Sequence, residues 1–242
     1  MTGADPLALV VVPPSGESQP VHLNDRRSRR QWTVEVQPFA IGRVPVTESA
    51  LGRSALDARH GDLPATEVSW RDAIVACNHL STRHGLTAAY QLTPVPEESA
   101  PRWAPHDRPA PDDLLVTWDQ AATGFRLPTE AEWELACRAG TIGARYGDLD
   151  QIAWHRGNSR ESPQPVGRKT PNPWGLHDML GGVWEWCWDQ YDPAVYGSYR
   201  VLRGGGWFDE PWSCRAGVRR RSHPSLRIDD VGFRLAQSLT RD

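Results

Sequence analysis

The feature that most constrains the fold of this chain is its combination of many tryptophans with many glycines and prolines. The sequence holds 12 Trp but only 4 Phe, and Gly and Pro number 21 each. Glycine and proline interrupt helices and strands, whereas a large indole fixes neighbouring loops by burying a wide apolar surface. This profile favours a loop-rich domain over a helix bundle. With 242 residues, 39% of them hydrophobic, the chain is expected to form a single domain, residues 1–242.

Two segments carry clear helix signals. Ser69 and Asp72 have the spacing of a capping box, and the apolar residues that follow fall on one helical face. Thr129 and Glu132 repeat this spacing at the start of a second segment. Each segment has one cysteine on its apolar side, which we expect to be a core thiol.

The rest of the chain has the pattern of short strands and loops. Apolar and polar residues alternate from Trp32 to Val36, and further apolar pairs on both sides of Gly42 predict short strands there. After Gly140 no segment keeps a helical spacing, so the second half is expected to be loops on a small sheet. Residues 93–113, rich in proline and charge, are predicted to be a surface insertion.

Charge and cysteine usage argue against several classes of protein. The formal net charge is -3 and the pI about 6.2, so the basic footprint of a nucleic-acid-binding protein is missing. The apolar segment at residues 7–12 is too short to span a membrane and lacks the basic start of a signal peptide, which predicts a cytoplasmic location. The four cysteines form no CxxC pair and are predicted to be free thiols: Cys77, Cys137, Cys187 and Cys214.

Common catalytic motifs are missing as well. The sequence has no HExxH, no GxSxG, no phosphate loop ending in GK and no GxGxxG after a strand. Residues 204–206 are three glycines, which we interpret as a close approach of the backbone to a neighbour. Arginines crowd at 215 and 219–221, where a solvated face is favoured over an anion-binding rim.

Six phrases of the chain, in order, resemble the formylglycine-generating enzyme (sulfatase-modifying factor) family. They extend from about Trp32 to Ala236, and their number and order carry the resemblance. The family has an irregular α+β fold related to C-type lectins, which implies two main helices on small antiparallel sheets here. The phrases are VEVQPFAIGRVPVT, PATEVSWRDAIVACNHLS, GFRLPTEAEWELACRAG, NPWGLHDMLGGVWEWCWD, RVLRGGGW and DVGFRLA.

The resemblance assigns the family's oxygen site to particular residues. In the family enzymes two cysteines bind Cu(I), oxygen is activated there, and a substrate cysteine becomes formylglycine. By position, Trp207 is the aromatic residue before the cysteine pair, Asp209 replaces the first cysteine and Cys214 matches the second. Gly206 replaces a family serine, and Trp184 matches the tryptophan that walls the oxygen site.

A carboxylate at position 209 changes the metal chemistry that such a site supports. Cu(I) prefers thiolates, whereas a carboxylate suits Fe(II), Mn(II) or Ca(II). Copper is therefore expected to bind weakly, and Cys214 with Asp209 and His223 is predicted to form a different redox site for Cu or Fe. The alternative is that Cys214 is a small buried thiol.

The resemblance also implies structural calcium. Residues 178–185 match the family's calcium loop, and a second family site would begin at Asn158. Hard oxygen ligands from a turn are what Ca²⁺ requires, although a polar turn held by its own hydrogen bonds is the alternative for both segments. The implied ligands of the first site are the side chains of Asp178 and Glu185 and the backbone carbonyls of Met179, Gly181 and Val183.

Two functions of different classes follow. The first is a metal-dependent oxidase or oxygenase that acts on a peptide or a small thiol or amino-acid-type substrate through Cys214, Asp209 and Trp184; the retention of Cys214 and Trp184 favours it. The second is a catalytically silent, calcium-stabilised lectin-like module that binds a peptide, protein or small-molecule ligand. In either case, the residues expected to contact the substrate or ligand are Trp207, Trp212, Arg215 and His223.

Overall fold

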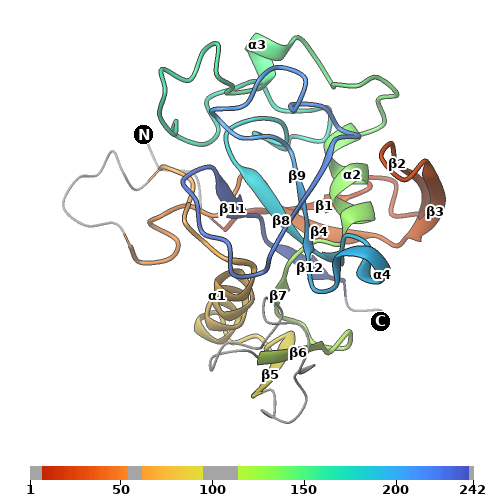
Figure 1. Cartoon of the computed structure of the whole chain (residues 1–242). Helices are drawn as coiled ribbons and strands as arrows, with labels where there is room; N and C mark the ends of the chain where they lie inside the picture. The colour runs from red at the N-terminus through yellow and green to blue at the C-terminus, as the bar shows by residue number, and fades with distance from the viewer. Residues whose placement is uncertain (1–6, 54–61, 95–113, 240–242) are drawn as a thin grey trace.

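The computed structural model describes residues 7–53, 62–94 and 114–239. In Figure 1 strand β8 (Trp184–Gln190) runs through the middle of the molecule, and the two main helices, α1 (Trp70–Arg83) and α2 (Glu130–Arg138), lie to either side of it. The helical turn α3 (Leu149–Ile152) lies at one end of the molecule, and strands β5 (Tyr90–Pro94) and β6 (Leu114–Trp118) lie at the opposite end (Figure 1). Of the predicted surface insertion, residues 95–113 lie outside the described residues, and residues 93–94 end strand β5.

Both predicted helices form where the capping boxes place them. In each, the hydroxyl of the N-cap residue, Ser69 or Thr129, accepts the backbone N–H three residues later, and the acidic side chain there accepts the N-cap N–H in return. After residue 140 the described helices are single turns, as predicted. The helices are α1 (Trp70–Arg83), α2 (Glu130–Arg138), α3 (Leu149–Ile152) and α4 (Pro193–Tyr196).

The strands form two four-stranded sheets and two hairpins. The first sheet has the order β1 (Leu9–Val12), β4 (Phe39–Gly42), β12 (Ala236–Ser238), β7 (Phe125–Arg126). The second has the order β10 (Arg219–Ser222), β9 (Arg200–Arg203), β8 (Trp184–Gln190), β11 (Val231–Phe233). The hairpins are β2 (Gln19–Asp25) with β3 (Arg30–Val36), and β5 (Tyr90–Pro94) with β6 (Leu114–Trp118).

Two details of the sheets differ from the predictions. Strand β11 pairs with β8 in parallel, so the sheets are not purely antiparallel. The strand expected after Gly42 does not form, because Val46 donates its N–H to Phe233 and accepts one from Ala65 in an irregular crossing. The small mixed α+β architecture itself is as predicted.

Buried indoles hold these loops together. Trp70, Trp133 and Trp186 are at most 2% exposed, and each N–H has an acceptor on a distant segment. For example, Trp70 on α1 donates to the carbonyl of Cys187 on β8 at 3.0 Å. Tryptophan thus anchors the loops in the way its abundance indicated. All four cysteines are buried and free.

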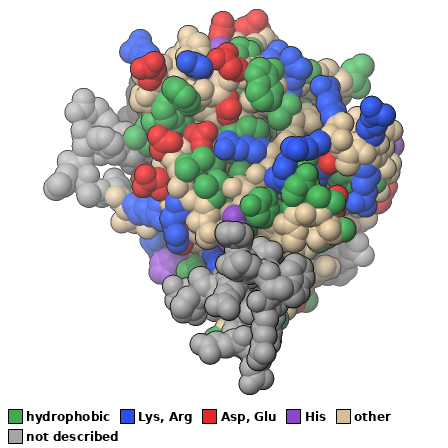
Figure 2. All heavy atoms as spheres, viewed as in Figure 1, with side chains coloured by type: hydrophobic (Ala, Val, Ile, Leu, Met, Phe, Trp, Pro, Cys, Tyr) green, Lys and Arg blue, Asp and Glu red, His purple; other side chains and the backbone are tan. Residues whose placement is uncertain are grey.

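The prediction that the arginine run on β10 is a solvated face is wrong for Arg219, whereas the Arg220 side chain is 40% exposed. The Arg219 side chain is only 4% exposed and pairs with Glu130 at 2.5 Å and Asp25 at 3.5 Å. Arg221 lies 3.8 Å from the ring centroid of Tyr196. Figure 2 shows basic, acidic and hydrophobic side chains interspersed over the visible face. Within the described ranges, no helix is both long and apolar enough to cross a membrane.

Candidate functional site

Trp184 and Asp209, two of the three predicted catalytic residues, are in direct contact. Trp184 begins β8 and is 2% exposed, and its indole N–H donates to Asp209 Oδ2 at 2.5 Å. The same oxygen accepts the backbone N–H of Gly206 at 2.8 Å. Asp209 therefore closes the turn that follows β9 and fastens it to β8.

Cys214, the third predicted catalytic residue, lies beneath this turn. Its side chain is fully buried, and a Cβ added to Gly205 would lie 3.0 Å from Sγ. Burial raises the pKa of the thiol to about 12, the charge of Asp209 raises it as well, and Arg145 lowers it. Because the thiolate is the nucleophile and metal ligand, this thiol is almost entirely in its unreactive form at neutral pH.

The glycines of residues 204–206 make the close approach that the sequence suggested. Gly204 and Gly205 have φ of +105° and +89°, which disfavour any other residue. At Gly206 a Cβ would lie 2.7 Å from Asp230 Oδ2. The family serine cannot occupy position 206 unless Asp230 moves, so these two residues depend on each other.

Asp230 is a member of this site that sequence reasoning missed. Its Oδ1 is buried and has no hydrogen-bond partner in the described part of the chain, and its Oδ2 lies 3.9 Å from Arg220 Nη1. Burial raises the pKa of Asp230 from 3.8 to about 6; Arg220 lowers it, and Asp209 raises it further. The signal in the sequence was the acidic pair Asp229 and Asp230, whose second member opens the phrase DVGFRLA.

The predicted transition-metal ligands do not converge. Within the described ranges, no group of three or more His, Cys, Asp or Glu could hold a metal ion. His223 instead shares a 2.7 Å hydrogen bond with Ser225 and contacts Tyr199 edge-on. The structure therefore does not group His223 with Cys214 and Asp209 as the ligands of a Cu or Fe site among the described residues.

The two acidic side chains of the predicted calcium loop differ in how their oxygens are used. Both Glu185 oxygens accept from Arg234, the closest contact being 2.8 Å, and Oε2 also accepts the indole N–H of Trp133 at 2.7 Å. Asp178 accepts the N–H of Gly167 at 2.6 Å through Oδ2, while its buried Oδ1 has no partner among the described residues. Burial raises the Asp178 pKa.

The backbone part of the calcium loop is partly consistent with a cation. The carbonyl oxygens of Met179 and Val183 lie 3.4 and 3.5 Å from a Cβ built on Gly204, so both lie beside this glycine, as does the Trp133 ring. With the unpaired oxygen of Asp178, the loop supplies hard oxygen donors of the kind that Ca²⁺ binds. Glu185, by contrast, is already neutralised by Arg234. Gly181 donates its N–H to Gly204 and has φ of +74°.

Asn158, the candidate for a second calcium site, lies in a hydrogen-bonded turn. Its Oδ1 accepts the N–H of His155 at 2.9 Å, and its Nδ2 donates to the carbonyl of Ala153 at 3.0 Å and to Asp150. This is the polar turn that the sequence left open as the alternative. Nothing in its contacts marks Asn158 as a cation ligand.

The loop at residues 207–216 presents aromatic side chains to solvent on a fixed backbone. Phe208 and Trp212 are 50% and 60% exposed. Arg145 donates to the carbonyls of Cys214, at 2.9 Å, and Pro211. On the other side the N–H of Arg156 donates to the carbonyl of Asp209 at 3.0 Å, and its guanidinium lies 5.1 Å from the Phe208 ring centroid. We call this segment the braced loop.

The remaining predicted contact residues are less exposed. Trp207 is 7% exposed, and its indole N–H donates to the carbonyl of Asp229 at 3.0 Å. Arg215 is half-buried, and its Nε has no acceptor within the described ranges. Within the braced loop, Trp207 thus packs inward, whereas Trp212 points outward.

Comparison with known proteins identifies the chain's relatives. Residues 4–239 match the model of the sulfatase-modifying factor enzyme 1-like domain. The chain is 31% identical over 256 residues to hercynine oxygenase of Mycolicibacterium smegmatis, a match that covers 90% of this chain and 57% of that protein. It is 28% identical over 241 residues to the inactive C-alpha-formylglycine-generating enzyme 2 of Mus musculus, covering 86% of this chain and 78% of that one.

A solved structure shares nearly the whole fold. Treponema denticola variable protein 1 superposes with a TM-score of 0.79 at 30% identity, and the match covers 96% of this chain and 95% of that one. The similarity therefore extends over both sheets and the loops between them.

Proposed function

Because the chain belongs to the sulfatase-modifying factor enzyme 1-like family, we propose that it is a recognition member of this family, which binds a peptide or protein through the braced loop. The observation that carries this proposal is the exposure of Phe208 and Trp212 on a backbone fixed from both sides. Aromatic side chains on a rigid frame lose little conformational entropy on binding, and they are enriched among the residues that dominate binding energy.

The chemistry of the neighbouring interior supports recognition rather than oxidation. The Cys214 side chain is fully buried, and Oδ2 of Asp209 already accepts hydrogen bonds from the Trp184 indole and the Gly206 backbone. The mouse relative is named as an inactive enzyme, which supports the use of this fold without catalysis.

A peptide-library selection tests the proposal. Displayed random peptides are selected on the intact chain, and the dissociation constant of the enriched peptide is measured by calorimetry. We expect Trp212→Ala and Phe208→Ala to weaken binding at least about 10-fold, as truncation of a central aromatic anchor does. Val195→Ala, which alters a side chain 66% exposed on α4, is the matched control and should leave binding unchanged. Equal affinity in all three variants would contradict the proposal.

A second candidate function is a metal-dependent oxidase or oxygenase. The observation in its favour is that Cys214, Asp209 and Trp184 are neighbours, in a chain 31% identical to a hercynine oxygenase. Oxygen uptake measured with Fe(II) or Cu(I) and a cysteine-containing peptide distinguishes the two functions. Oxygen uptake that disappears in Cys214→Ser would establish the oxidase function. Oxygen uptake no faster than that of the free metal ion would exclude this function.

Calcium at residues 178–183 is a further part of the proposal. The unpaired Oδ1 of Asp178 and the carbonyls of Met179 and Val183 would hold the ion. Its role would be to fasten the start of β8 to the glycines that support the braced loop. The ion would be structural, remote from any chemistry.

A further inference from the structure

Two arginines beside the exposed aromatic side chains of the braced loop have no carboxylate partner. Arg145, half-buried, donates to backbone carbonyls only, those of Cys214 and Pro211. Arg215, also half-buried, has a buried Nε with no acceptor among the described residues. Neither guanidinium forms an ion pair in the part of the chain that the structure describes. Half-buried charges are screened less by salt than fully exposed ones, so both remain available to an anionic partner.

The carboxylates of the braced loop do not compensate these arginines. Asp209 points inward: its Oδ2 accepts from Trp184 and Gly206, and its Oδ1 lies 3.4 Å from Ser213 Oγ. Glu210 pairs with Arg156 at 3.0 Å, and both side chains are more than half exposed. The uncompensated charges beside this loop are therefore positive.

An apolar surface lies next to these charges. Besides Phe208 and Trp212, it includes Ile142, whose side chain is fully exposed. The segment that carries Ile142 is held against the braced loop, because Ala216 donates its N–H to the carbonyl of Ala144 at 2.8 Å. Arg145, on the same segment, reaches the carbonyl of Pro211, directly before Trp212. Exposed apolar side chains thus stand beside guanidinium groups that lack a carboxylate.

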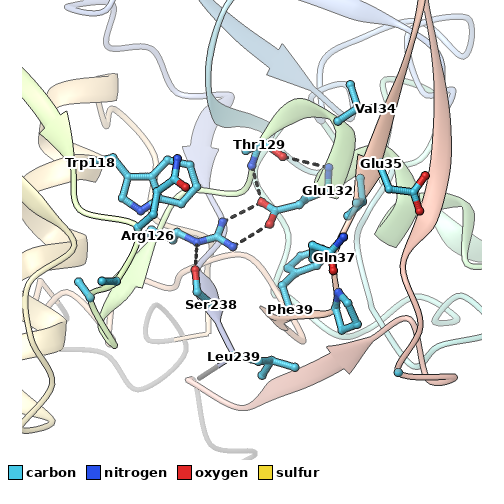
Figure 3. Close-up of a pocket in the computed structure, with 16 residues that line it drawn as sticks. Val34, Glu35, Gln37, Phe39, Trp118, Arg126, Thr129, Glu132, Ser238 and Leu239 are labelled. Carbon is cyan, nitrogen blue, oxygen red and sulfur yellow. Dashed lines mark hydrogen bonds and ion pairs between the residues drawn. The ribbon is translucent and has the colours of Figure 1, made fainter. Parts of the chain in front are cut away.

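The charged groups of a second region show the contrast. A cavity of about 1100 Å³ lies between β3, the start of α2 and β12, and Arg126 and Glu132 line it (Figure 3). Arg126 is 3% exposed and donates to both oxygens of Glu132 at 2.7 Å and to Ser238 Oγ at 3.0 Å. These groups satisfy one another, so they stabilise the fold and offer little to a ligand. The arginines beside the braced loop have no such partners.

Guanidinium groups form their strongest hydrogen bonds with carboxylates or phosphates, and complementary charge selects the partner of an interface. The whole chain has a formal net charge of -3, which disfavours a long polyanion such as a nucleic acid and favours a short acidic segment. Given the proposed function, on which this rests, we propose that the partner of the braced loop is an acidic peptide segment. In such a segment an apolar side chain meets Phe208 and Trp212, and neighbouring carboxylates meet Arg145 and Arg215.

The peptides selected on the intact chain test this partner. We expect the enriched sequences to carry more Asp and Glu than Lys and Arg. Calorimetry then compares an enriched peptide with its amide counterpart, in which Asn and Gln replace Asp and Glu. The amide peptide should bind at least about fivefold more weakly, and raising the salt concentration from about 50 to about 300 mM should weaken the acidic peptide more than the amide one.

Substitutions on the chain locate the charges. Arg215→Gln and Arg156→Gln should each weaken the acidic peptide about threefold or more, with a smaller effect on the amide peptide, whereas Glu210→Gln should strengthen the acidic peptide because it frees Arg156. Arg168→Gln is the matched control, since Arg168 is 63% exposed and pairs with Asp62 on another segment. It changes the net charge equally and should leave the ratio of the two affinities unchanged. Thermal melting checks that each variant is folded.

The possible results separate this partner from the proposed function itself. If no peptide is enriched, or if binding is insensitive to both Trp212→Ala and Phe208→Ala, the recognition function and the acidic partner both fail. If peptides bind through these aromatic residues but the acidic and amide forms bind equally, only the acidic partner is overturned. Tighter binding of a single-stranded DNA oligonucleotide than of the acidic peptide would also overturn it.

Discussion

Glu185 lies on strand β8, and Asp230 directly precedes the adjacent strand β11. Both carboxylates are buried, but they differ in whether their oxygens have hydrogen-bond partners. Glu185 is 1% exposed, and both of its oxygens accept hydrogen bonds from Arg234. Asp230 keeps a buried oxygen without a partner in the described structure, and its pKa is raised to about 6. The first carboxylate stabilises the fold as an ion, whereas ionisation of the second opposes folding. Burial alone therefore does not tell which carboxylate is structural.

The largest effect is expected from Glu185→Gln. The substitution keeps the shape of the side chain but leaves Arg234, which is 0% exposed, without its counter-charge. We expect the free energy of unfolding to fall by about 3–5 kcal/mol. Urea denaturation at pH 7 measures it. A loss below about 1 kcal/mol would show that the pair is not needed for stability.

The corresponding substitution of acid by amide at Asp230, Asp230→Asn, should raise the free energy of unfolding rather than lower it. The carboxyl ionises at 3.8 in the unfolded chain and at about 6 in the folded one, so wild-type stability declines as the pH rises between these values and is constant above. Asp230→Asn removes this loss and should stabilise the fold by about 2 kcal/mol at pH 7.

The pH dependence is the control for Asp230→Asn. Below pH 3.8 the wild-type carboxyl is protonated in both states, so the advantage of the variant should vanish there. Urea denaturation at several pH values follows it. A gain that is the same at acid and neutral pH would show that packing against Gly206, and not charge, is the cause.

Asp178 is intermediate between Glu185 and Asp230 in its hydrogen bonding, since Oδ2 accepts the N–H of Gly167 and the buried Oδ1 has no partner among the described residues. If calcium binds the unpaired oxygen, calcium at ten times its dissociation constant should raise the free energy of unfolding by about 1.4 kcal/mol. Thermal melting with and without calcium measures it, and Asp178→Asn should abolish the response. Magnesium is the matched control ion, because it demands a tighter octahedral shell. An equal response of wild type and variant would place calcium elsewhere.

The smallest effect on stability is expected from Trp212→Ala. The side chain is 60% exposed, and the bracing contacts of its loop come from other residues. The free energy of unfolding should change by less than about 0.5 kcal/mol, as for ordinary surface substitutions. Urea denaturation checks this, and a large loss would mean that Trp212 is a packing residue rather than a recognition anchor.

Features encoded by neighbouring residues were predictable from the sequence. The capping boxes at Ser69 and Thr129 placed both helices, because the two partners of each box are three residues apart. The glycines at 204 and 205 correctly indicated a close backbone approach. The prediction that Arg219 is exposed to solvent was wrong because its ion-pair partners, Asp25 and Glu130, are remote in sequence.

The sequence by itself determined the family, the two helices and the use of indoles as anchors, since these depend on local spacing and on the order of phrases along the chain. Only the tertiary structure decided the state of the candidate site. The paths of the loops join Asp209 to Trp184, bury Cys214 and pair His223 with Ser225. The same loop paths also place Asp230 in contact with Gly206 and leave Trp212 exposed to solvent. Such contacts between distant segments depend on how the loops cross, and not on the residues alone.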